Sequence, residues 1–169
     1  MNAVFGIGSK RLPWQTVAMF ALGFWLSGSL IVDFVLMPCL YTAGMMNQAS
    51  FATTGYSIFW IFNRIELLCA ALVLVSLLAL RGTSHLYLYV RRWAVFLAAL
   101  LLTIAIIYTY IMTPQMSALA VQLNLLEPSA EIPSGMVSMQ GGYWLLETIK
   151  ITAGALVLSW CYRDSRRLV

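Results

Sequence analysis

The stretch YSIFWIFNRIELLCAALVLVSLLAL, residues 56–80, is apolar enough to cross a membrane, yet it carries Arg64 and Glu66 in its interior. A spanning helix needs about 20 predominantly apolar residues. Three further stretches, at about 13–41, 92–112 and 143–162, meet the same requirement. The sequence therefore predicts an all-α fold, a bundle of four transmembrane helices.

The composition supports the same fold class. Of the 169 residues, 62% are hydrophobic and only 9% are charged, whereas soluble domains are about 45–50% apolar and 25% charged. Four spans take up so much of the chain that no separate soluble domain fits. We therefore predict one integral membrane domain, residues 1–169.

Basic residues flank the predicted spans on one side only. They precede the first span, lie between the second and third, and follow the fourth: Lys10, Arg11, Arg81, Arg91, Arg92, Arg163, Arg166 and Arg167. The loops on the other side carry Glu127 and Glu131 and no lysine or arginine. The positive-inside rule then places both termini on the cytoplasmic or stromal side. We predict a multi-pass protein of the bacterial inner membrane or the cyanobacterial thylakoid membrane.

The net charge of +4 is explained by this topology rather than by a nucleic-acid partner. Arginines near the cytoplasmic ends of spans attract anionic lipid headgroups. We expect that role for Arg91, Arg92, Arg163, Arg166 and Arg167. The segment 113–142 on the opposite side mixes proline and glycine with apolar residues, so we expect a short amphipathic helix at about 115–126 on the membrane surface.

Charged residues within the spans are the most informative feature of the sequence. A charge at the bilayer centre costs roughly 2.5–3.5 kcal/mol on insertion scales, so such residues face one another, a cavity or a partner. Counting from the non-cytoplasmic ends of their helices places these residues at a shared depth of roughly 8–15 Å. The sequence thus predicts a buried polar cluster of Asp33, Asn63, Arg64, Glu66, Glu147 and Lys150.

Helical spacing limits the pairing within this cluster. Arg64 and Glu66 are two residues apart and point in different directions, so Arg64 needs a partner from another helix, and we expect Asp33. Glu66 and Glu147 then compete for Lys150. The charges sum to minus one when all groups are ionised, and we expect Glu66 to be the protonated carboxyl group.

Four roles are open for this layer. The layer could serve as an internal salt-bridge network, as a proton or ion pathway, as a contact with another protein's helix, or as a polar ligand pocket. In the last case Tyr108, Tyr110 and Gln115 would line the pocket beside Asn63.

A weak internal repeat is also visible. The first span ends in LMPC at 36–39 and the third in MTPQ at 112–115, whereas the second carries NRIE at 63–66 and the fourth ETIK at 147–150. These matches suggest two helix hairpins in the same orientation, related by an axis along the membrane normal.

Soft-metal ligands gather at the non-cytoplasmic end. Thioethers and thiolates select Cu(I), so Met37, Cys39, Met112 and Met116 are candidate ligands; methionine also fills irregular gaps in cores. His85 is the only histidine, so bis-histidine haem within one chain is excluded. No phosphate loop or nucleophile elbow is present in the sequence. We therefore predict neither a cofactor nor enzymatic activity.

Two motifs carry a family resemblance: LMPCLY at 36–41, which closes the first span, and FNRIE at 62–66 in the second. With them the chain resembles a broad group of small four-helix membrane proteins of unknown function. It is more loosely similar to the membrane domain of CopD-type copper-resistance proteins. The resemblance implies residence in a membrane and a four-helix fold.

The sequence as a whole favours a non-enzymatic accessory, assembly or scaffold protein. Its helices would contact membrane lipids and dock on other membrane-protein helices or on a second copy of the chain. The alternative is a small transporter or binder of protons, polar ligands or soft metal.

Overall fold

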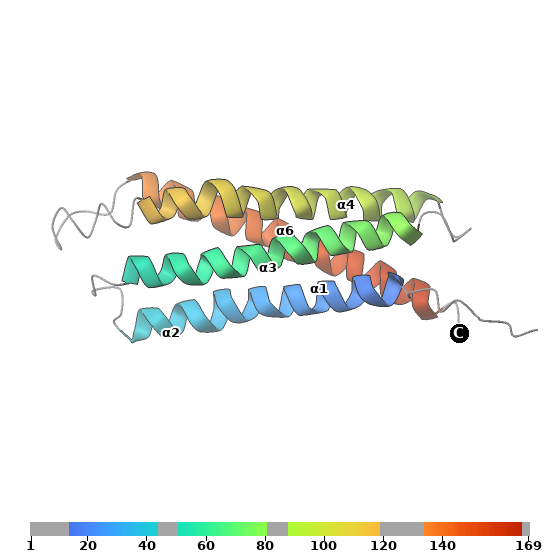
Figure 1. Cartoon of the computed structure of the whole chain (residues 1–169), viewed down its shortest axis with the longest axis horizontal. Helices are drawn as coiled ribbons and strands as arrows, with labels where there is room; N and C mark the ends of the chain where they lie inside the picture. Colours follow the sequence, from blue (N-terminus) through green and yellow to red (C-terminus); the bar gives the residue numbers. More distant parts are fainter. Residues whose placement is uncertain (1–13, 44–50, 81–87, 119–133, 167–169) are drawn as a thin grey trace, which may run out of the picture.

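The computed structural model of the chain describes residues 14–43, 51–80, 88–118 and 134–166. All of the secondary structure in these ranges is helical, and it forms four packed rods that run along the long axis of the molecule (Figure 1). The elements are α1 (Trp14–Ile31), η1 (Val32–Leu36), α2 (Met37–Thr42), α3 (Phe51–Leu80), α4 (Leu88–Ile107), η3 (Tyr108–Met112) and α6 (Ser134–Arg166).

Each rod contains a segment that is long and apolar enough to cross a membrane. These spans are Trp14–Leu40, Thr54–Leu80, Arg92–Ala118 and Ser138–Asp164. The predicted fold class is therefore confirmed, and the chain is a multi-pass membrane protein. The start of α1 and the end of α6 lie at the same end of the bundle (Figure 1), as an even number of spans requires.

Two spans are longer than the sequence analysis expected. The third continues past Met112 to Ala118, and the last helix begins at Ser134, well before Tyr143. The expected surface helix at 115–126 is therefore corrected in part: residues 115–118 form the end of the third span. The remainder of that segment lies outside the described residues.

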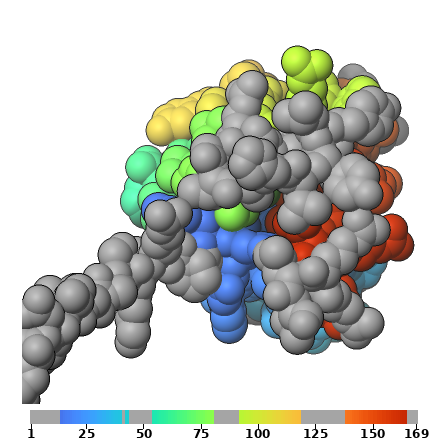
Figure 2. Space-filling model, turned by 90° about the vertical axis from the view of Figure 1, so that its right-hand side faces the viewer, coloured from blue at the N-terminus to red at the C-terminus, as the bar shows by residue number. Residues whose placement is uncertain are grey.

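The four helices surround one core, and the end-on view in Figure 2 shows α1, α3, α4 and α6 arranged around its axis. Small residues occupy many core positions, among them Ala70, Ala94, Ala98 and Ala153. They allow close approach of helices, which matters in lipid because burial of apolar surface does not distinguish a neighbouring helix from acyl chains. Trp25, at 2% exposure, is the largest side chain packed among them.

Short π-helical segments interrupt the first and third spans at matching places. In η1 the N–H of Met37 reaches back to the carbonyl of Val32, and in η3 the N–H of Thr113 reaches Tyr108. A proline follows each segment two residues later, Pro38 and Pro114. A proline ring clashes with the carbonyl four residues earlier, and widening the preceding turn relieves that clash. Such π-bulges often mark functional sites.

The contact between Gly154 and Leu26 gives a stability prediction. A Cβ atom built on Gly154 of α6 would lie 2.8 Å from Leu26 Cδ2 of α1, whereas one on Gly23 would meet nothing within 4 Å. Gly154→Val therefore displaces the Leu26 side chain or α1 itself, and we expect a loss of about 1–3 kcal/mol of unfolding free energy. Denaturant titration of tryptophan fluorescence in detergent micelles measures it, with Gly23→Val as the control. Equal losses for both variants would contradict the packing described here.

Candidate functional site

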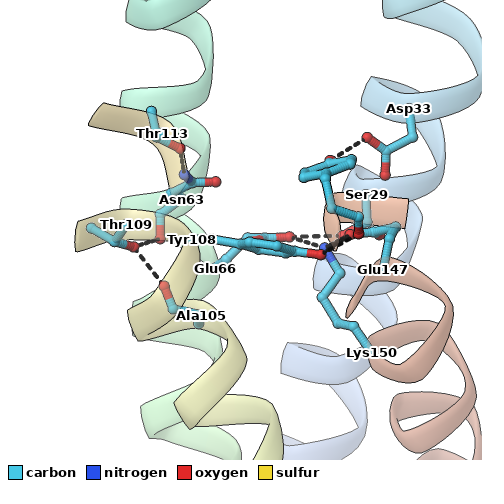
Figure 3. Close-up of polar contacts among 11 residues, drawn as sticks. Ser29, Asp33, Asn63, Glu66, Ala105, Tyr108, Thr109, Thr113, Glu147 and Lys150 are labelled. Carbon is cyan, nitrogen blue, oxygen red and sulfur yellow. Dashed lines mark hydrogen bonds and ion pairs between the residues drawn. The ribbon is translucent and has the colours of Figure 1, made fainter. Parts of the chain in front are cut away.

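Lys150 of α6 lies at the centre of a buried polar cluster. Its Nζ is 2.6 Å from Glu66 Oε1 of α3 and 2.7 Å from Glu147 Oε2, one turn earlier on α6. All three side chains are only 1% exposed. The predicted buried salt bridge is thus confirmed, and Lys150 pairs with both carboxylates instead of one. Figure 3 shows the cluster.

Hydroxyl groups also contact these carboxylates. Ser29 of α1 donates to Glu66 Oε1 at 2.9 Å. The Tyr108 hydroxyl of η3 lies 3.2 Å from Glu147 Oε2 and 3.1 Å from the carbonyl of Tyr143. Because each of the four spans contributes a side chain, the cluster ties the whole bundle together.

Asp33 lies on the outer side of this network, within η1. Its Oδ1 accepts a 2.6 Å hydrogen bond from the hydroxyl of Tyr143. The ring of Tyr143 stacks on that of Tyr108, with centroids 5.1 Å apart. The carboxyl groups of Asp33 and Glu147 also lie within hydrogen-bonding reach of each other.

Two carboxylate oxygens of this cluster are buried without a donor. They are Asp33 Oδ2 and Glu147 Oε1, and no hydrogen-bond partner for either exists in the described part of the chain. A buried polar atom without a partner costs about 1–3 kcal/mol, and more when it is charged. The two atoms therefore require an explanation.

Arg64 lies outside the cluster, which corrects the expected Asp33–Arg64 pair. Its side chain is exposed on the outer surface of α3, with Cζ 4.7 Å from the centroid of the Trp60 ring. The reason is helical geometry: two residues turn a helix by about 200°, so Arg64 points outward because Glu66 points inward. Asp33 instead finds its donor on α6.

Asn63 belongs to a second polar contact on the same level. Its Nδ2 donates to Thr113 Oγ1 at 2.6 Å, and Thr109 Oγ1 donates to the carbonyls of Ala105 at 2.7 Å and Asn63 at 3.4 Å. In Figure 3 this contact between α3 and η3 lies beside the ionic cluster. The predicted layer is therefore divided into an ionic part and a neutral part.

The other predicted site residues are scattered. Of the expected pocket residues, Tyr108 joins the cluster, whereas Tyr110 and Gln115 are exposed. Met112 is buried against Ile104 and Tyr108, Met37 and Met116 are half-buried, and Cys39 is exposed. A soft-metal site of these four residues stays a prediction.

The arginines expected at lipid headgroups fall near the ends of helices. Arg92 and Arg163 are exposed. The side chains of Arg91 and Arg166, and all of Arg167, lie outside the described residues.

Two members of the cluster, Ser29 and Tyr143, were not expected from the sequence. Ser29 lies four residues before Asp33, and Tyr143 four residues before Glu147. Residues at that spacing share a helix face. The spacing alone would therefore have brought both side chains into the predicted layer.

The structure also extends the internal repeat. When the sequence is aligned on Pro38 and Pro114, η1 aligns with η3, and Asp33 corresponds to Thr109. In the other two spans Asn63 corresponds to Glu147, Arg64 to Thr148 and Glu66 to Lys150. The central ion pair Glu66–Lys150 thus joins corresponding positions of the two halves.

Comparison with known proteins adds no relative: no family model, no curated protein and no solved structure matches this chain. The likeness to the CopD-type membrane domain stays a prediction. What is established is a four-span membrane protein with a buried ionic cluster.

Lys150 gives a direct test of the ionic cluster. Lys150→Met leaves Glu66 and Glu147 buried without a counter-ion, and we expect a loss of about 3–5 kcal/mol of unfolding free energy. Arg64→Met removes the same charge from an exposed position, and we expect a change within about 0.5 kcal/mol. Both values come from denaturant titration in micelles. A Lys150→Met variant as stable as Arg64→Met would show that the ion pairs do not hold the bundle together.

Proposed function

We propose that this chain is a non-enzymatic accessory or assembly protein that docks, through the outer face of α3, on a helix of a larger membrane complex. The observation that supports this role is Arg64: a cation on the outside of the bundle, within a span. Counted from Thr54, Arg64 lies about 15 Å into the helix. A charge at this depth that is not buried in its own bundle needs an anion from elsewhere.

The surroundings of Arg64 are apolar. Exposed hydrophobic side chains flank it at helical spacing, and the most exposed of them is Leu68 at 71%: Trp60, Ile61, Ile65, Leu68 and Leu72. Such a surface is normal where a helix faces lipid. The guanidinium group is the exception, and the face of Trp60 supplies only a weak contact of about 0.5–1 kcal/mol at exposed sites.

Four exposed hydroxyl groups in the spans satisfy themselves. The hydroxyls of Ser27, Thr103, Thr148 and Thr152 each donate to the carbonyl four residues earlier in their own helix. Arg64 cannot do so, because a guanidinium group has five N–H donors and a full positive charge, which a backbone carbonyl does not neutralise. In the described part of the chain, both ion pairs belong to Lys150.

The internal repeat offers a comparison for this position. The corresponding position on α6 is Thr148, which is also exposed and bonds its own backbone. A threonine is therefore compatible with the same place in the bundle. This difference between the halves favours a role for Arg64 in binding.

Charge complementarity favours a different protein over a second copy as the partner. Of the described acidic residues, Asp33, Glu66 and Glu147 are buried, and Asp164 lies at the opposite end of the bundle. A copy of this chain thus presents no described carboxylate at the depth of Arg64. The partner that fits carries an aspartate or glutamate on a membrane helix at that depth.

Native purification followed by mass spectrometry tests this proposal. We expect a second membrane protein to co-purify with the wild type and to be lost with Arg64→Thr. This change removes the cation and introduces the residue found at the corresponding position, Thr148. Arg163→Thr, which removes an exposed arginine at the far end of the bundle, is the matched control. Arg64→Thr should fold as well as the wild type.

Three results would overturn the proposal. A partner that Arg64→Thr retains would show that α3 docks by another contact. Recovery of only this chain with phospholipid would assign Arg64 to a lipid headgroup, and recovery as an oligomer would make the partner a second copy.

A further inference from the structure

We propose that Asp33 and Glu147 form a proton-binding site in which one proton, held between Asp33 Oδ2 and Glu147 Oε1, joins α1 to α6. This inference is independent of the docking role. It starts from the charge of the buried cluster: the carboxyl groups of Asp33, Glu66 and Glu147 surround the single ammonium group of Lys150. Because Arg64 lies outside, full ionisation would leave two uncompensated negative charges in the described cluster.

The hydrogen bonds indicate which carboxyl groups hold the proton. Glu66 Oε1 accepts from both Lys150 and Ser29, so this group is supplied with donors as an ionised carboxylate. Asp33 and Glu147 each have one oxygen supplied and one oxygen buried without a donor. The proposal therefore places the proton on the Asp33–Glu147 pair and not on Glu66, where the sequence analysis expected it.

The geometry brings the two unsupplied groups together. Their carboxyl groups lie within hydrogen-bonding reach of each other, and in Figure 3 Asp33 lies directly above Glu147 with one of its oxygens directed toward it. Two carboxylates that face each other in a buried site cannot both be ionised without a large cost. One proton gives each oxygen a partner and removes one negative charge.

The other half of the repeat holds neutral groups at the corresponding positions. There the Thr109 hydroxyl lies 3.4 Å from the backbone carbonyl of Asn63, and the Asn63 amide donates to Thr113. These groups bring their own hydrogens. Two carboxylates have none, so a hydrogen between Asp33 and Glu147 has to be taken up from solution.

Four titratable groups face the site, and they come from every neighbouring element: Glu66 of α3, Tyr108 of η3, and Tyr143 and Lys150 of α6. Tyr143 donates to Asp33 Oδ1, and Tyr108 donates to Glu147 Oε2. Lys150 forms ion pairs with Glu147 Oε2 and with Glu66. None of them reaches the two facing oxygens. The proton is therefore the group that the site lacks.

Infrared spectroscopy of the full chain in detergent micelles tests the proposal. At neutral pH we expect the carbonyl stretching band of a protonated carboxyl group, shifted by D₂O. Asp33→Asn should remove it, because the new amide can donate to Glu147 and still accept from Tyr143. Glu66→Gln is the matched control and should keep the band. Absence of the band from the wild type, or its persistence in Asp33→Asn, overturns the proposal.

The pH dependence of stability provides a second measurement, made on the wild type and on Asp33→Asn. The folded chain holds a proton that the unfolded chain releases at neutral pH, so stability falls as pH rises. Above the pKa of an unfolded carboxyl group, about 4, and up to the pH at which the folded pair releases its proton, the folding equilibrium constant should drop about tenfold per pH unit. Asp33→Asn should lose this part of the dependence. A wild type whose stability is constant or rises with pH contradicts the proposal. So does stabilisation by sodium over choline at equal ionic strength, because a metal cation would then fill the site.

Discussion

The bridge that Lys150 makes between Glu66 and Glu147 is the interaction on which the rest of the structure depends. In lipid, an apolar helix face packs against acyl chains as readily as against another helix, so apolar surface alone does not determine how four spans pair. An ammonium group between two carboxylates does, because any other arrangement leaves a charge in a medium that cannot solvate it. Ser29 and Tyr108 extend this constraint to the remaining spans.

The backbone that presents these groups is irregular for a clear reason. Pro38 and Pro114 lie within helices, where each removes a hydrogen-bond donor and crowds the carbonyl of the preceding turn. The chain responds with the π segments η1 and η3 in the same register before each proline. Asp33 and Tyr108 belong to these segments and are turned into the bundle, so the prolines contribute to the site although they do not touch it.

The two halves of the chain share this backbone but differ in chemistry. Glu66 and Lys150 occupy corresponding positions and pair with each other. Asn63 and Thr109 are neutral where Glu147 and Asp33 are acidic, and Arg64 lies on the outer surface where the other half has Thr148, which bonds its own backbone. The two halves share the π segments before each proline and the positions of the central ion pair. They differ at the buried acids Asp33 and Glu147 and at the exposed cation Arg64, and both proposals rest on these differences.

The sequence by itself determined the fold class, the four spans and the depth of the charged layer, because apolar length and the cost of intramembrane charge are properties of the chain alone. It also determined that Arg64 and Glu66 point apart, since helical spacing sets that angle. Only the tertiary structure decided which faces turn inward. The choice depends on packing between spans, and it took Arg64 out of the cluster, gave Lys150 two partners and placed Asp33 beside Glu147 and Tyr143 on another helix.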